Sequence, residues 1–182
     1  MLYQQFDYSL IREAGSPIKG FGGVASGPAP LQELHGHVRR ILGGSVEKKV
    51  TVTTVVDLMN LIGKCVVSGN VRQTAEIAFG NPKSVEYIDL KNYEKNPHRA
   101  DYGWTSNNSV YCELGMNYEE ICERVRTNGE PGFFWLKNAQ DYGVMGSPPV
   151  PVVRPAPRLI ILFLGLQGCQ VARRQPVPGA DA

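Results

Sequence analysis

Cysteine is scarce in this chain, and its few copies stand apart from one another. None forms a C-x-x-C pair, and no histidine accompanies them at zinc-site spacing. His35 and His37 are two residues apart, which on a helix places them on different sides, so no shared metal site is predicted. We expect separate, reduced thiols in a cytoplasmic protein. The four cysteines are Cys65, Cys112, Cys122 and Cys169.

The net charge is also low, and long apolar runs are rare. The formal net charge is only +2 at pH 7, and no block of lysine and arginine alternates with aromatic residues. This pattern excludes an extended nucleic-acid surface. The N-terminus has no charged segment followed by an apolar one, so no secretory signal is predicted. The strongly apolar run at residues 159–166 is far shorter than the roughly 20 residues of a membrane helix. Neither nucleic acid nor a membrane is expected as a partner.

The chain does contain enough apolar material for a hydrophobic core, because 42% of its 182 residues are hydrophobic. Helical and strand-like apolar patterns alternate along it, which predicts an α/β fold. Residues 91–99 are polar and typical of a surface connection, whereas residues 133–136 are typical of a fully buried strand. Helices are expected over residues 28–42, 51–64, 84–90 and 117–127, and strands over 75–79, up to 111, and over 133–136.

The composition changes after residue 145. Five prolines stand between residues 148 and 157, and no periodic pattern survives beyond them. We therefore predict two parts: residues 1–145 as the folded unit, and residues 146–182 as a Pro-rich tail, mostly extended or disordered, outside its core.

A glycine-containing loop follows the helix predicted at residues 51–64. Gly69 and Asn70 accept a positive φ at low cost, so the chain can turn sharply there. Arg72 and Gln73 then offer a guanidinium fork and an amide just past the bend. This pattern is typical of a loop that holds a planar or anionic ligand. An ordinary helix end with a solvated arginine has the same pattern, and both interpretations stay open.

A second glycine-rich loop spans residues 12–23. Its glycines allow backbone N–H groups to form an anion cradle, and Arg12 and Lys19 supply positive charge, so a phosphate group is the natural ligand. A long surface loop with two solvated cations is the alternative. Residues 20–25 also match the dinucleotide pattern G-x-G-x-x-A. We reject that interpretation because Pro17 precedes the pattern and Pro28 follows it, where a strand and a helix are needed.

Several uncommon blocks in this order resemble the adenosylcobalamin-dependent (class II) ribonucleotide reductases. The resemblance covers residues 6–145. It implies part of a ten-stranded α/β barrel, in which a cysteine thiyl radical generated by adenosylcobalamin drives reduction of ribonucleotides for deoxyribonucleotide biosynthesis and DNA replication. The blocks lie at residues 6–9, 15–23, 25–28, 63–65, 68–72 and 128–133.

The resemblance also implies roles for both loops. The loop at residues 15–23 matches the family's first specificity loop, where Arg12, Ile18 and Lys19 would contact a deoxynucleoside triphosphate effector. The second specificity loop would lie between effector and substrate, with Arg72 reaching toward the ribonucleotide. The family usually has arginine where this chain has Gln73, which would alter affinity or base preference. The second loop comprises Ser68, Gly69, Asn70, Val71, Arg72 and Gln73.

The chain departs from the family in what it does not contain. The family's radical cysteine lies in an Asn-Pro-Cys segment that these 182 residues do not include. The resemblance places the redox cysteine pair and the cobalamin-binding region outside the chain, and it matches Cys65, Cys112 and Cys122 to positions that are not catalytic. We expect no catalytic residue here and a fragment that is inactive alone, whereas the full-length enzyme would use thioredoxin or another dithiol. The alternative is a non-catalytic, nucleotide-binding regulatory piece.

Overall fold

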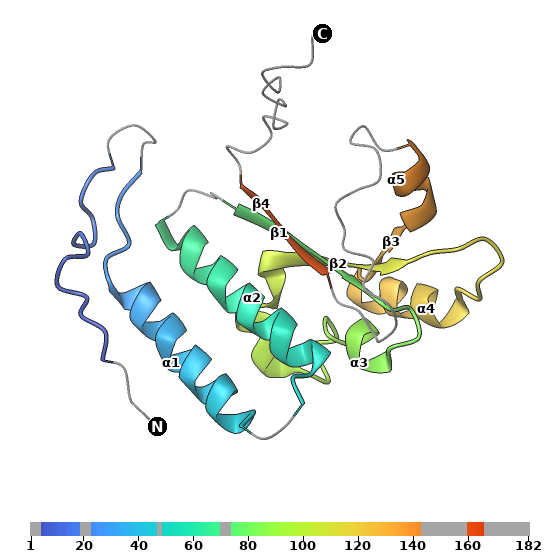
Figure 1. Ribbon diagram of the computed structural model, residues 1–182, viewed down its shortest axis with the longest axis horizontal. Helices are drawn as coiled ribbons and strands as arrows, with labels where there is room; N and C mark the ends of the chain where they lie inside the picture. The colour runs from blue at the N-terminus through green and yellow to red at the C-terminus, as the bar shows by residue number, and fades with distance from the viewer. Residues whose placement is uncertain (1–4, 19–22, 47–48, 70–73, 143–159, 166–182) are drawn as a thin grey trace, which may run out of the picture.

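The described part of the chain forms a small sheet with helices packed against it. The computed structural model describes residues 5–18, 23–46, 49–69, 74–142 and 160–165 (Figure 1). Strands β1 (Thr74–Gly80), β2 (Ser106–Tyr111) and β3 (Gly132–Phe134) run parallel, and β4 (Ile160–Gly165) pairs antiparallel with β1. The order within this described sheet is β3-β2-β1-β4. The predicted α/β class is confirmed.

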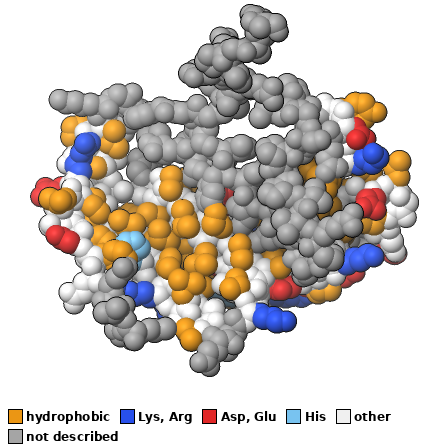
Figure 2. All heavy atoms as spheres, viewed as in Figure 1, with side chains coloured by type: hydrophobic (Ala, Val, Ile, Leu, Met, Phe, Trp, Pro, Cys, Tyr) orange, Lys and Arg blue, Asp and Glu red, His pale blue; other side chains and the backbone are white. Residues whose placement is uncertain are grey.

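Two long antiparallel helices cover one side of the sheet. Helix α2 (Val52–Val66) packs on β1, and α1 (Ala29–Gly44) lies against α2 (Figure 1). Thr51 begins α2 because its side chain accepts a hydrogen bond from the Thr54 amide at 3.1 Å. Helix α1 buries none of its residues completely. Figure 2 shows apolar side chains gathered over the face formed by α1 and α2.

Shorter elements connect the strands. Helix α3 (Val85–Ile88) follows β1, and the 3-10 turns η2 (Pro97–Asp101) and η3 (Gly103–Thr105) lead into β2. Helix α4 (Glu119–Asn128) joins β2 to β3 and ends at Gly129 with φ of 75°, and α5 (Leu136–Tyr142) follows β3. Tyr118 stands at the N-cap of α4 and makes no side-chain cap hydrogen bond, whereas Asn117, one residue earlier, accepts from the Glu119 amide at 2.9 Å. The hydrophobic core comprises Val56, Ala78, Tyr87, Ile88, Leu90, Val110, Cys112 and Ile121.

Two expectations from the sequence need correction. Residues 91–99 are not merely a surface connection, because Lys91 and Arg99 are buried. The strand after α4 is not fully buried: Phe133 is 42% exposed and Trp135 40%. In the described sheet β3 is an edge strand with a strand partner on one side only, so its side chains have fewer neighbours than those of a central strand.

One segment of the predicted tail pairs with the sheet. Residues 160–165 form β4 and pair with β1 from Thr74↔Gly165 to Phe79↔Ile160, so this segment joins the sheet. Pairing with this segment satisfies backbone N–H and C=O groups along that edge of β1. The division of the chain at residue 145 stays a prediction. No helix within the described ranges is long and apolar enough to cross a membrane.

Candidate functional site

The first predicted loop begins as a short two-stranded ribbon directly ahead of α1. The Gly15 amide donates to the Ala25 carbonyl at 2.9 Å, and the Ala25 amide donates to the Ser16 carbonyl at 2.8 Å. Gly15 has φ of 85°, which a residue with a side chain rarely adopts, so the tight backbone requires glycine there. The ribbon therefore leads into α1 at a fixed place.

The second predicted loop begins where α2 ends. The helix continues into the 3-10 turn η1 (Val67–Gly69), in which the Ser68 hydroxyl donates to the Cys65 carbonyl at 2.7 Å. This bond satisfies one of the carbonyl groups that a helix end leaves without an intrahelical partner. Ser68 and Gly69 therefore extend the helix before the loop proper starts. The predicted ligand residues Asn70, Val71, Arg72 and Gln73 lie outside the described residues.

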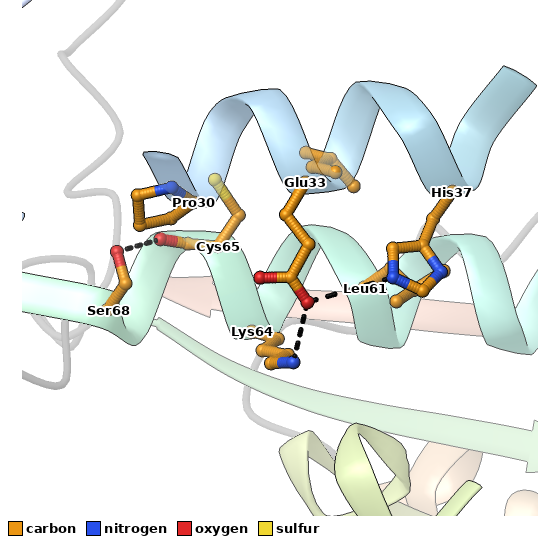
Figure 3. A pocket seen from close by; sticks show the side chains of 8 residues that line it. Pro30, Glu33, His37, Leu61, Lys64, Cys65 and Ser68 are labelled. Carbon is orange, nitrogen blue, oxygen red and sulfur yellow. Dashed lines mark hydrogen bonds and ion pairs between the residues drawn. The ribbon is translucent and has the colours of Figure 1, made fainter. Parts of the chain in front are cut away.

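A small cavity lies between the first turns of α1 and the last turns of α2 (Figure 3). Because the two helices are antiparallel, the first loop ends and the second loop begins at this same end of the helix pair. Its volume of about 100 Å³ is too small for a nucleotide, whose pockets span roughly 300–1,000 Å³. It is lined by Pro30, Glu33, Leu34, His37, Leu61, Lys64, Cys65 and Ser68.

Lys64 links the two helices at this end of the pair. Its Nζ donates to the Glu33 carboxylate at 3.0 Å and to the Asp101 carboxylate at 2.7 Å, which links α1, α2 and η2. These two contacts, chiefly the one to Asp101, raise the pKa of Lys64. Burial and the nearby Glu33 raise the pKa of the Cys65 thiol, which disfavours its nucleophilic thiolate form. The contacts of Lys64 thus hold α1, α2 and η2 together beside this cavity.

The predicted effector residues are placed only in part. Arg12 is exposed, and its Nη1 donates to the Pro17 carbonyl at 3.4 Å across the turn of the same loop. Ile18 is half-buried, and its amide donates to the Gly23 carbonyl at 3.1 Å. Lys19 lies outside the described residues. His35 and His37 have separate partners, Tyr8 and Glu33, and no His, Cys, Asp and Glu group in the described part could hold a metal ion.

A buried polar cluster that the sequence reasoning missed lies at the beginning of β1 and β2. Glu76 is 3% exposed, and its Oε2 accepts from Asn60 Nδ2 on α2 at 3.0 Å. Lys91 is also buried; its Nζ donates to the Ser106 carbonyl at 2.5 Å and lies 3.3 Å from Glu130 Oε2. A charged residue inside the apolar stretch 75–79 was the signal in the sequence that could have pointed to this cluster.

Burial controls the acid–base properties of the cluster. Desolvation raises the pKa of Glu76 to about 7, although the hydrogen bond from Asn60 and the charge of Lys91 oppose the shift. Desolvation likewise raises the pKa of Asp57, against the opposing charge of Arg99, and it lowers the pKa of Lys91. Glu76 therefore changes its charge near neutral pH.

This shift predicts that the chain becomes less stable as the pH rises through neutrality. Between the ordinary pKa of 4.5 and the folded value of about 7, the folded state binds more protons at Glu76 than the unfolded state. The unfolding free energy should therefore fall by on the order of 2 kcal/mol between about pH 5 and about pH 8. Urea denaturation at both pH values measures this difference. In Glu76→Gln, whose side chain cannot ionise, the difference in unfolding free energy between the two pH values should be smaller. An equal pH dependence in both proteins would contradict the assignment to Glu76.

The arrangement defines a class of protein: an α/β domain in which an antiparallel helix pair carries the bases of two glycine-containing loops at one end. Residues 4–42 match the model of a family described as "B12-dependent ribonucleotide reductase, insertion domain". This stretch contains Arg12, Ile18 and Lys19.

Individual relatives point to the same family. The chain is 61% identical over 140 residues to a Dictyostelium discoideum protein named "Probable adenosylcobalamin-dependent ribonucleoside-triphosphate reductase" and 56% identical over 145 residues to the Euglena gracilis "Adenosylcobalamin-dependent ribonucleoside-triphosphate reductase". These matches cover 77% and 80% of this chain but only 18% and 20% of the relatives.

A solved class II ribonucleotide reductase, dependent on B-12, has the same fold in this region. It matches with a TM-score of 0.62 and 37% sequence identity, over 72% of this chain and 18% of that structure. Sequence and fold thus agree, and the resemblance to the class II ribonucleotide reductases is confirmed. The chain spans about a fifth of the length of the curated relatives it matches.

Proposed function

We propose that this chain is part of an adenosylcobalamin-dependent ribonucleoside-triphosphate reductase and supplies its nucleotide-sensing loops. The observation that carries the proposal is the high identity to reductases over 140 and 145 residues, together with the family-model match at residues 4–42, which includes the first loop. Triphosphate substrates are proposed because the names of these relatives specify them. The complete enzyme would work in deoxyribonucleotide biosynthesis in the cytoplasm and would take electrons from thioredoxin or another dithiol.

The fold supports the proposal that the strands of this chain form part of a larger sheet. The parallel strands β1, β2 and β3 are proposed as part of the ten-stranded barrel, in residues 1–145, with residues 146–182 as a divergent tail. Phe133 and Trp135 beside β3 are large apolar side chains that stay partly exposed in this chain. Further strands of the complete barrel would cover them, because a sheet edge with apolar neighbours is otherwise prone to association.

The two loops are proposed to bind different nucleotides. Arg12, Ile18 and Lys19 would contact the deoxynucleoside triphosphate effector, with the two cations facing its phosphates. The loop formed by residues 68–73 would lie against the ribonucleotide, and Arg72 would provide its positive charge. Gln73 offers an amide where the family usually has a second arginine, so it can form hydrogen bonds but adds no charge. Fixing the loop bases at the Lys64 end of α2 supports this role, since it limits the entropy lost on binding.

The radical chemistry is proposed to take place outside this chain. Adenosylcobalamin would generate the thiyl radical in the complete enzyme, whose cobalamin-binding region is proposed to lie outside this chain. Burial raises the pKa values of the Cys65 and Cys112 thiols, which does not favour a redox role for them. This chain's residues would bind and orient nucleotides rather than transfer electrons.

Nucleotide binding by the chain tests the proposal. Titration with a deoxynucleoside triphosphate should raise the melting temperature progressively, because a ligand at about 100 times its Kd adds about 2.7 kcal/mol to the unfolding free energy. Lys19→Ala should weaken effector binding about tenfold, and Arg72→Ala should do the same for a ribonucleoside triphosphate. The exposed Arg126 on α4 provides the matched control, as Arg126→Ala removes an equal charge away from both loops. No thermal shift at millimolar nucleotide would contradict the proposal.

Turnover by the 182-residue chain is the complementary measurement. With adenosylcobalamin, a dithiol and a ribonucleoside triphosphate, we expect no deoxynucleotide, because no radical cysteine has been located in these residues. Sustained product formation would overturn the proposal that the chain acts only as the nucleotide-sensing part. Binding without turnover is also what a regulatory piece would show, and complementation by the remainder of the reductase then decides between the two roles.

A further inference from the structure

The edge of β1 that faces away from β2 has none of the features that protect a free sheet edge. β1 is seven residues long, contains no proline and pairs with β2 along its other edge. Natural sheets protect free edges with proline, with charged side chains or with very short strands. The one charged residue of β1, Glu76, is buried and accepts a hydrogen bond from Asn60 on α2, so its charge does not guard this edge. β1 therefore needs a partner on this side.

The opposite edge of the described sheet differs in both respects. β3 is three residues long, and Pro131, which has no backbone N–H group, directly precedes it. β3 thus offers few backbone groups to an added strand, whereas β1 offers a ladder of seven residues. Within the described part of the chain, the edge of β1 is therefore the stronger acceptor for an extended segment.

The segment at residues 160–165 fills this acceptor edge. It forms β4, which pairs with β1 from Thr74↔Gly165 to Phe79↔Ile160 (Figure 1). The segment reads Ile-Ile-Leu-Phe-Leu-Gly, without charge or proline. An exposed segment of this composition associates readily with other extended chains. Pairing β4 with β1 therefore removes two association-prone backbones from solvent at the same time.

The direction of β4 shows what this edge can accept. β4 runs antiparallel to β1, whereas β1, β2 and β3 are parallel to one another. The N–H and C=O groups of a strand edge can pair with a neighbour in either direction. Backbone pairing at this edge therefore does not require a strand of one direction, and an extended apolar segment without proline is sufficient.

We propose that the outer edge of β1 is an acceptor for one extended apolar strand, and that the chain's own segment 160–165 occupies this edge and so excludes a second copy of the chain. When β4 is displaced, the free edge of β1 pairs with an extended segment of another copy. This role of β4 does not depend on the proposed nucleotide binding.

Binding of a peptide to the full 182-residue chain tests the proposal. The probe is a fluorescent peptide with the sequence of residues 160–165, flanked by lysines for solubility, and fluorescence anisotropy measures its Kd. The double variant Ile161→Pro with Leu162→Pro removes an N–H group that faces β1, because successive N–H groups of a strand point to opposite sides. This variant should bind the peptide at least about tenfold more tightly than the wild type, whose edge is already occupied.

The double variant Ile161→Val with Leu162→Val is the matched control. It changes the same two residues, but it keeps both N–H groups and introduces a residue type that favours strands. Its peptide binding should be as weak as that of the wild type. Equal peptide affinity in all three proteins would overturn the proposal. The absence of binding by a proline variant that circular dichroism shows to be folded would overturn it as well.

Self-association provides a second measurement. Sedimentation velocity should show dimers or larger species for the proline variant, because the free edge of β1 then pairs between copies. The peptide should suppress these species, since it covers the same edge. The wild type and the valine control should sediment as monomers. Association of the wild type to the same extent as the proline variant would show that β4 does not protect the edge.

A third measurement needs no variant, and it decides the question if the proline variant does not fold. Every second N–H group of β4 faces β1, so alternate amides of residues 160–165 should exchange hydrogen at least about tenfold more slowly in the wild-type chain than in the free peptide. Exchange at the rate of the free peptide throughout this segment would overturn the occupation of the β1 edge by β4.

Discussion

Arg99→Ala is expected to lower the unfolding free energy by about 3–5 kcal/mol, which is enough to unfold many small domains. Arg99 has no exposed surface, and its Nη1 contacts the Asp57 carboxylate of α2. Its guanidinium also lies over the ring of Tyr102, 5.8 Å from the centroid. Removing the guanidinium leaves a buried carboxylate without its cation and opens a cavity between η2 and α2. Urea denaturation followed by circular dichroism measures the loss.

Two comparisons isolate the cause of this effect. Arg126→Ala removes an arginine whose side chain is 70% exposed and whose partner is Glu123 on the same helix, so its cost should stay within about 0.5 kcal/mol. The double variant Asp57→Asn with Arg99→Met removes both charges, and it should recover a substantial part of the stability lost in Arg99→Ala. A loss below about 1 kcal/mol in Arg99→Ala would show that the pair does not hold α2 in place.

Gly80→Ala is expected to cost about 3 kcal/mol or more. A Cβ atom at the end of β1 would stand 2.3 Å from ring carbons of Tyr87. The ring cannot move away cheaply, because the Tyr87 hydroxyl donates to the Ala78 carbonyl at 2.7 Å and accepts from the Ser109 amide at 3.2 Å. Either β1 shifts, or Tyr87 loses the hydrogen bonds that join it to β1 and to β2. Chemical denaturation of the purified variant measures the cost.

Gly36→Ala provides the matched control. Gly36 lies inside α1, where an added Cβ would meet no atom within 4 Å. Because alanine is the better helix former, this substitution should stabilise the chain by about 0.5–1 kcal/mol. If Gly80→Ala proved equally harmless, the close packing of Tyr87 against β1 would be wrong.

Local sequence signals predicted most of the regular elements. The apolar periodicity around Val56 and Leu61 identified α2, and Ser84 correctly marked the beginning of α3 through its hydrogen bond to the Tyr87 amide. The ordered blocks pointed to the class II reductases, and the relatives confirm that resemblance. These features depend on residues close together in the sequence, so the pattern itself carries the information.

The burial of charged residues could not be read from the sequence. Residues 91–99 are polar enough for a surface loop, yet Arg99 lies in the interior because Asp57 stands 42 positions earlier on the facing side of α2. Conversely, the apolar residues 133–136 are partly exposed because β3 has a strand partner on one side only in the described sheet. In each case a distant segment determines whether the local pattern is satisfied.

The sequence by itself determined the α/β class, the positions of the two glycine-containing loops and the resemblance to a reductase family. Only the tertiary structure decided that the bases of both loops meet at the Lys64 end of the helix pair, and that Glu76 lies buried on Gly63. The physical reason is that glycine's missing side chain and a carboxylate's charge are local properties, whereas their consequences depend on what is packed against them. The Glu76 carboxyl group loses its solvent, and comes close to Gly63, only when α2 folds onto β1.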